Sequence, residues 1–131
     1  MKAVLYCKSV PGKSAMAQEI QLRRLCKKRG WIVHGVYVDP PGRPPRLASS
    51  KGRLALIEAL LSRKRRFRAV CVWRVGMLGN AIDDILWLLE EASVKRGVHI
   101  VTIADSFDTT RGTGAVKNVI ATLTRVARTG Q

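Results

Sequence analysis

The stretch Lys2-Ala-Val-Leu-Tyr-Cys-Lys-Ser-Val10, followed by Pro11-Gly12, sets the pattern for the whole chain. Its apolar core, from Ala3 to Cys7, has the length of a buried strand, and the proline and glycine end it in a turn. Apolar residues among charges then predict a helix over 14–29, and Gly30 is placed to stop it. The chain therefore opens with a strand followed by a helix.

The same alternation continues along the chain. Strands are predicted at 31–38, 68–73 and 98–104, and helices at 52–62, 81–96 and 114–128. This alternation over 131 residues favours the α/β class, as one domain over 1–131 with a mainly parallel sheet of four to five strands flanked by helices. Four prolines and a glycine in 39–50 exclude regular structure there and predict a mobile loop.

Composition narrows the class of partner. A net charge of +15, from 24 Lys and Arg against 9 Asp and Glu, indicates a polyanionic partner, with nucleic acid as the default. The three cysteines lie in apolar strand and helix patterns without metal-ligand spacing, which is typical of reduced thiols in a cytoplasmic protein. No apolar run reaches the roughly 18 residues of a membrane span. We therefore expect no metal, cofactor or membrane contact.

Landmarks along the chain, taken in order, resemble the catalytic domain of the resolvase/invertase serine recombinases. They are Lys2–Val10, Gln21-Leu-Arg-Arg-Leu25, Arg29-Gly-Trp31, Val36-Tyr-Val-Asp39, Val72-Trp-Arg74, Leu78-Gly79, Arg96-Gly-Val-His-Ile-Val101 and Phe107-Asp-Thr-Thr110. The resemblance covers essentially the whole chain. It implies the fold of that catalytic domain, DNA as the partner, and a final helix over 114–128 that pairs subunits.

The resemblance also shows what has changed at the catalytic positions. The family pattern Tyr-x-Arg-Val-Ser places its arginine on Lys8 and its nucleophilic serine on Val10. The charged members of the family turn Asp-Arg-Leu-x-Arg fall on Gly76, Met77 and Asn80, so all three are replaced by uncharged residues. A further family arginine matches Arg53, across a loop of variable length.

These changes predict a pseudoenzyme. Phosphoryl transfer depends on a nucleophile and on cations around the phosphoryl oxygens. Removing one preorganised donor typically costs about 2.7 to 4 kcal/mol of transition-state stabilisation. Several such groups are replaced here together with the nucleophile, so we expect no DNA cleavage or strand exchange.

Ser9 provides the main alternative, an active recombinase with a relocated nucleophile. In that interpretation Lys8, Arg53 and Arg74 would act in rearranged roles. Side chains alternate along a strand, so Ser9 would point away from the family serine position unless the turn is remodelled. As a loop serine before a proline and a glycine it needs no catalytic role, and the sequence favours that interpretation.

Parallel strands bring their carboxyl ends to one rim, where open sheets of this class bind ligands. Lys8, Ser9, Arg74, Gly76 and Asp105 are expected at that rim. The positive charge is concentrated elsewhere, at candidate nucleic-acid-binding residues on the end of the second helix and on the final helix. These are Arg63, Lys64, Arg65, Arg66, Lys117, Arg125 and Arg128.

Together these patterns predict a recombinase-like protein that acts by binding DNA or other subunits. The apolar residues of the final helix recur at helical spacing, which favours a homodimer or a hetero-oligomer with an active recombinase. The sequence stops at Gln131, so no separate DNA-binding domain is expected within it. A second alternative is a basic nucleic-acid-binding module with no link to recombination.

Overall fold

A computed structural model of the chain describes residues 1–40, 51–112, 114, 117 and 120–121. Four parallel strands form one sheet in the order β2-β1-β3-β4 within these residues. The strands are β1 (Lys2–Lys8), β2 (Ile32–Asp39), β3 (Ala69–Val72) and β4 (His99–Thr102), and the α-helices are α1 (Ala15–Arg29), α2 (Lys51–Leu61) and α3 (Ile82–Leu89). The predicted α/β class and parallel sheet are therefore confirmed.

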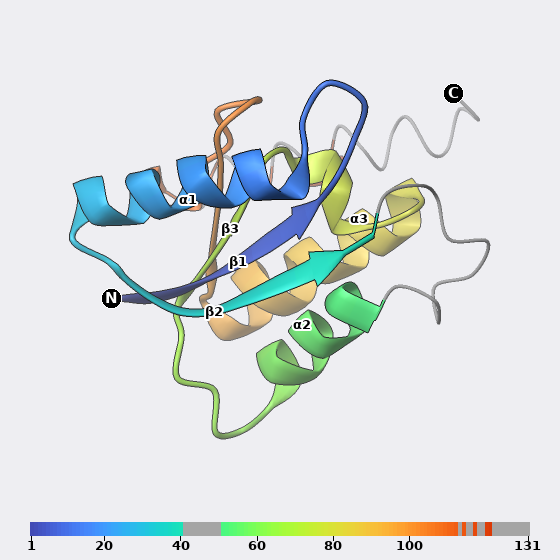
Figure 1. The fold of residues 1–131 in the computed structure, drawn as a ribbon. Helices are drawn as coiled ribbons and strands as arrows, with labels where there is room; N and C mark the ends of the chain where they lie inside the picture. Colours follow the sequence, from blue (N-terminus) through green and yellow to red (C-terminus); the bar gives the residue numbers. More distant parts are fainter. Residues whose placement is uncertain (41–50, 113, 115–116, 118–119, 122–131) are drawn as a thin grey trace.

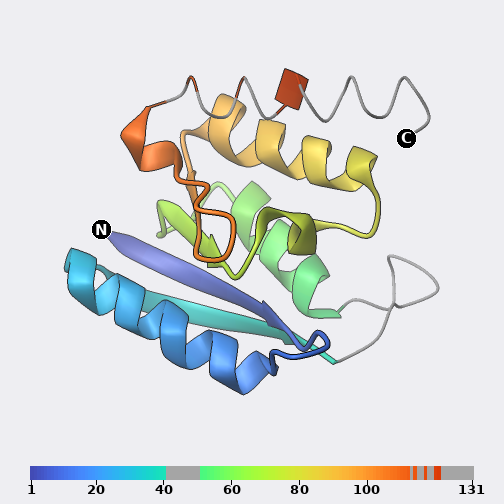
Figure 2. The ribbon, with the colours of Figure 1, turned by 90° about the horizontal axis from the view of Figure 1, so that it is seen from above.

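The helices form a layer on each face of the sheet. Figures 1 and 2 show α1 on one face, and α2 and α3 on the other. In β1, Ala3, Leu5 and Cys7 face a core shared with α1, whereas Val4 and Tyr6 face the core beneath α2 and α3. Burial of both faces explains why β1 is apolar throughout rather than alternating.

Element boundaries differ from the sequence-based ones in detail. The predicted helix over 81–96 is α-helical only to Leu89 and continues as a π-helical turn, Glu90–Val94. The third and fourth strands are shorter than predicted at both ends. Beyond them, the carbonyl oxygen of Trp73 accepts hydrogen bonds from the N–H groups of both Ile103 and Ala104, which departs from the regular pairing of the two strands. Residues 114, 117, 120 and 121 are helical as predicted. The rest of that helix and the 41–50 part of the predicted loop lie outside the described residues.

The outer edge of β4 is covered by the chain returning after it. Thr102 donates its N–H to the carbonyl oxygen of Phe107 at 2.8 Å, Asp108 pairs with Val101, and Ile100 donates to Oγ1 of Thr109 at 2.9 Å. A covered edge cannot pair with another strand.

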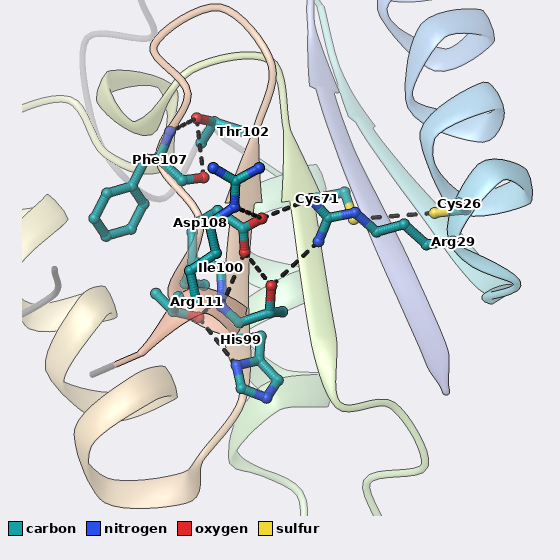
Figure 3. A network of polar contacts seen from close by, with 11 residues as sticks. Cys26, Arg29, Cys71, His99, Ile100, Thr102, Phe107, Asp108 and Arg111 are labelled. Carbon is teal, nitrogen blue, oxygen red and sulfur yellow. Dashed lines mark hydrogen bonds and ion pairs between the residues drawn. The ribbon is translucent and has the colours of Figure 1, made fainter. Parts of the chain in front are cut away.

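The return segment is tied to α1 by one ion pair, drawn in Figure 3. Nη2 of Arg29 donates to Oδ2 of Asp108 at 2.6 Å. Burial opposes ionisation of Asp108, but the hydrogen bonds from Arg29 and Thr110 outweigh it and lower its pKa. The ion pair thus fixes the end of α1 against the chain beyond β4.

The three cysteines are buried and unpaired, as predicted. Sγ of Cys26 on α1 lies 4.0 Å from Sγ of Cys71 on β3 (Figure 3). The contact with Cys26, together with burial, raises the pKa of the Cys71 thiol. Burial likewise raises the pKa of Cys7 to about 11. The thiols therefore act as small apolar groups between α1 and the sheet.

Candidate functional site

A groove of about 520 Å³ lies at the carboxyl ends of β1 and β3. It is lined by Lys8, Ser9, Val10, Pro11, Gly76, Met77, Gly79 and Asn80. The fold therefore brings together five of the six positions that the resemblance assigns to catalysis, along with the alternative nucleophile Ser9. Arg53, the remaining candidate, lies behind the groove wall.

The first wall of the groove is a tight turn after β1. Val10 and Lys13 exchange two backbone hydrogen bonds of 3.0 Å. Pro11 and Gly12 occupy the corners, and Gly12 has a φ of 81°, as a type II turn requires. This turn fixes the backbone that carries Val10 at the mouth of the groove.

Gln18 anchors the same wall to α1, although the sequence analysis did not single it out. Its side chain is fully buried, donates to the carbonyl oxygen of Lys8 at 2.6 Å, and accepts from the N–H of Lys8 at 3.1 Å. A signal was present in the sequence, because Gln18 shares the spacing of four with Leu22 and Cys26 and so lies on the buried face of α1.

Ser9 borders the groove, but its hydroxyl is engaged with a helix. Oγ of Ser9 accepts the N–H of Ala15, the first residue of α1, at 2.8 Å. This contact satisfies one of the free N–H groups that every helix start exposes. The bond gives Ser9 a structural role that the sequence alone did not reveal.

The second wall is the short 3₁₀ helix η2 (Val75–Leu78). Oδ2 of Asp105 accepts the N–H of Val75 at 3.0 Å, so Asp105 holds this wall from the loop after β4. Gly79 is needed at its end, because a Cβ there would lie 2.6 Å from Cβ of Asp84 in α3. Arg74 precedes η2 and is exposed. Of the three charged residues predicted at this rim, Lys8 lines the groove, Asp105 supports this wall and Arg74 is exposed.

Arg53 is buried behind that wall, with 2% of its surface exposed. Its Nε donates to the carbonyl oxygen of Leu78 at 2.7 Å, and its Nη1 has no hydrogen-bond partner among the described residues. Burial lowers the pKa of the guanidinium. Arg53 therefore brings a cation with a free donor close to the groove.

Asp39 organises the start of α2 beside Arg53. Its carboxylate accepts hydrogen bonds from the hydroxyl of Tyr6 at 2.5 Å and from the N–H groups of Gly52 at 2.7 Å and Arg53 at 3.0 Å. Burial and this hydrogen bond raise the pKa of Tyr6. Gly52 is required because a Cβ would lie 2.6 Å from the carbonyl oxygen of Val38. The sequence alone places Asp39 at the start of a loop, because a residue that caps a helix 13 positions further along the chain leaves no local pattern.

The chemistry available in the groove is limited. Its described lining contains Lys8 as a cation, Ser9 as a hydroxyl and Asn80 as an amide, but neither a histidine nor a carboxylate. Three or more His, Cys, Asp or Glu side chains nowhere gather into a metal-binding group in the described part of the chain. The groove can thus hold an anion, but it offers few groups for proton transfer or charge stabilisation.

Of the predicted basic residues that the structure describes, one is hydrogen-bonded to the backbone and the others are exposed to solvent. Arg65 is half-buried, and its Nε donates to the carbonyl oxygen of Phe67 at 3.1 Å. Arg63, Lys64 and Arg66 are exposed, and none forms an ion pair among the described residues, which include all nine acidic ones. Lys117 is also exposed. Arg125 and Arg128 lie outside the described residues.

Comparisons with known proteins agree with this fold. A family model described as "Resolvase, N terminal domain" matches residues 8–129. No curated protein matches the chain. None of the described helices is both long and apolar enough to cross a membrane.

Three solved structures share the fold. The N-terminal catalytic domain of TP901-1 integrase has a TM-score of 0.82 at 20% identity, covering 100% of this chain and 99% of that one. A resolvase family site-specific recombinase from Streptococcus pneumoniae has a TM-score of 0.81 at 18% identity, covering 99% and 89%. The C-terminal catalytic domain of ISC1926 TnpA, an IS607-like serine recombinase, has a TM-score of 0.62 at 20% identity, covering 94% and 80%. At these identities the likeness concerns the fold alone.

Proposed function

The chain belongs to the resolvase N-terminal domain family of serine recombinases, and we propose that it binds DNA without cleaving it. One observation carries the proposal. The groove that holds the family's catalytic positions presents Val10, Met77 and Asn80, where the resemblance places the nucleophile and two cations. The fold is kept while the reactive groups are replaced.

The remaining polar groups do not restore the missing chemistry. Val10 carries no hydroxyl, and the hydroxyl of Ser9 is hydrogen-bonded at the start of α1. Among the described residues, the cation Lys8 lines the groove and the cation Arg53 is buried behind its wall. Phosphoryl transfer without a metal depends on several positioned cations and an activated nucleophile. The arrangement therefore favours a protein that holds DNA phosphates without attacking them.

The charge distribution supports the DNA-binding part of the proposal. The net charge is +15, and Arg63, Lys64 and Arg66 are exposed without acidic partners in the described structure. Cations free of intramolecular ion pairs can neutralise phosphates and release counterions, so affinity should fall steeply with salt.

Subunit pairing through the final helix is the second part of the proposal. The partner is a second copy or an active recombinase, to which this chain would contribute DNA contacts but no cleavage. Ile120 packs against the domain's own core, so part of the helix's apolar stripe is used within the chain. The residues of the stripe beyond it lie outside the described structure.

The decisive experiment mixes the protein with supercoiled DNA and with suicide-nicked recombination substrates, followed by denaturing gels. We expect a salt-sensitive complex on native gels and no covalent protein-DNA adduct. An adduct that is lost in Ser9→Ala would instead identify an active recombinase with a relocated nucleophile. If RNA and random duplexes bind as tightly as the recombination substrates, the result would favour a basic module unrelated to recombination.

A further inference from the structure

A second hollow, of about 390 Å³, lies at the rim opposite the groove. It is bounded by β2, the end of α2 and the connection from α2 to β3. Figure 1 shows this connection at the amino ends of the strands. Its lining is His34, Tyr37, Ala59, Ser62, Lys64, Arg65, Arg66 and Phe67. The volume falls in the range of small-ligand sites. The hollow combines cations with aromatic rings, and its described lining contains no acidic residue.

His34 reaches this hollow because β2 has an irregularity in its register. Ala3 of β1 pairs with Val33, but the next residue, Val4, pairs with Gly35. His34 is therefore an extra residue in β2, an arrangement rare in parallel pairs. Such bulges redirect a side chain and are frequent near functional sites. The imidazole is exposed and makes no hydrogen bond within the described structure.

Tyr37 provides a flat wall next to His34. A Cβ at Gly35 would lie 3.9 Å from Cε2 of Tyr37, so the ring leans along β2 over the residue that has no side chain. Tyr37 is half-buried and packs against the core beneath α2. Its ring is thus held in place while part of it remains accessible.

The cations of the hollow have distinct roles. Arg65 is held by the carbonyl oxygens of Phe67 at 3.1 Å and Leu60 at 3.4 Å, which shapes the connection. Oγ of Ser62 accepts the N–H of Lys64 at 3.1 Å and fixes the turn before it. Lys64 and Arg66 keep their side chains exposed on this built turn. Two free cations are therefore positioned within one site beside two rings.

We propose that this hollow binds an unpaired nucleotide of single-stranded DNA. Lys64 and Arg66 would contact the phosphate, and the base would stack against Tyr37 and His34. Stacking on aromatic side chains with a basic surface for the backbone is how proteins hold single strands. A base within a duplex is stacked between its neighbours, so it cannot stack on the two rings. An acidic protein segment would contact the cations but would give the rings no role.

The inference rests on the proposed DNA binding and specifies a form of DNA and a site for it. The test is fluorescence anisotropy with a labelled 12-nucleotide oligothymidine and a labelled 12-bp duplex, each at fixed salt. We expect the single strand to bind more tightly than the duplex. Tyr37→Leu should weaken single-strand binding about tenfold through the lost stacking. Its duplex binding should stay within about twofold, because phosphate contacts carry that binding.

Matched variants separate stacking from charge and from misfolding. Arg66→Gln should weaken both ligands, whereas Arg24→Gln, an exposed arginine on α1 at the other face, should weaken the single strand less than Arg66→Gln does. Because Tyr37 also packs against the core, His34→Ala serves as a surface variant. It should reduce single-strand binding with an unchanged circular dichroism spectrum and thermal midpoint.

The outcomes separate the two proposals. Duplex binding with no preference for the single strand, or single-strand binding unaffected by both Tyr37→Leu and His34→Ala, would refute the nucleotide site and leave the proposed function standing. No binding to either DNA would refute both. Displacement of the oligonucleotide by polyglutamate at lower concentration than by unlabelled oligothymidine would identify the hollow as a contact for an acidic protein instead.

Discussion

The two rims of the sheet use their polar side chains in opposite ways. At the groove, Ser9, Gln18 and Asp105 are hydrogen-bonded to backbone groups of neighbouring loops and helices. At the other rim, Lys64 and Arg66 are exposed and free of ion pairs in the described structure. The rim that resembles a catalytic site thus uses these three side chains to support its own backbone, whereas the opposite rim presents Lys64 and Arg66 to a partner.

This contrast can be tested, because a polar group committed to the backbone should affect stability and a free cation should affect association. The first test removes a carboxylate that accepts three hydrogen bonds near the groove. Asp39→Ala removes the acceptor for Tyr6, Gly52 and Arg53 and leaves buried donors unpaired. We expect a loss of about 3 kcal/mol in the free energy of unfolding, measured in urea.

Tyr6→Phe is the control for this change. It removes one of the three hydrogen bonds and should cost about 1 kcal/mol. Equal losses in the two variants would show that Asp39 does not stabilise the start of α2.

The second test concerns the ion pair behind the return segment. Asp108→Asn removes the charge that accepts from Arg29 and should cost about 2 kcal/mol at neutral pH. The folded pKa of Asp108 is lowered, so its contribution is complete above the unfolded pKa of about 3.9 and disappears as the pH falls through the folded value. Chemical denaturation at several pH values should show the two proteins converging in acid. A difference that stays constant down to the lowest pH would exclude this role for the charge.

The third test addresses Ser9. Ser9→Ala should cost about 1 kcal/mol, the usual effect of losing a side chain that satisfies a helix start, and should leave DNA affinity unchanged. Thermal unfolding and gel-shift titration check the two parts. Stability equal to the parent protein would mean that the hydroxyl is not committed to α1.

The smallest effect separates two neighbouring arginines. Arg65→Met should cost about 0.5 kcal/mol of stability, because its guanidinium is bound to backbone carbonyl oxygens. Arg66→Met should leave stability unchanged and reduce DNA affinity, mostly at low salt. Urea unfolding and fluorescence anisotropy measure both variants. A loss of stability in Arg66→Met together with a loss of DNA affinity in Arg65→Met would contradict these assigned roles.

Much of the fold could be predicted from the sequence because its signals are local. The apolar run of β1 indicates a strand buried on both faces, and Gly30 marks the end of α1. The break of the third helix into a π-helical turn at Glu90 has no comparable local signal in the sequence.

The site could be predicted only in part. Lys8, Val10 and Asn80 lie in one groove because the carboxyl ends of parallel strands meet at one rim, which the pattern of elements already implies. The capping role of Asp39 and the bulge at His34 depend on contacts between distant segments and on strand register. The sequence carries the identity of these residues but not their partners.

The three buried cysteines report how often α1 separates from the sheet. Cys7, Cys26 and Cys71 have no exposed surface and link β1, α1 and β3 on one face of the sheet. A thiol reagent can modify them only when that face separates from α1, so the rate of alkylation follows the frequency of opening. The rate at which each thiol reacts therefore measures local opening at a known position in the core, without any added label.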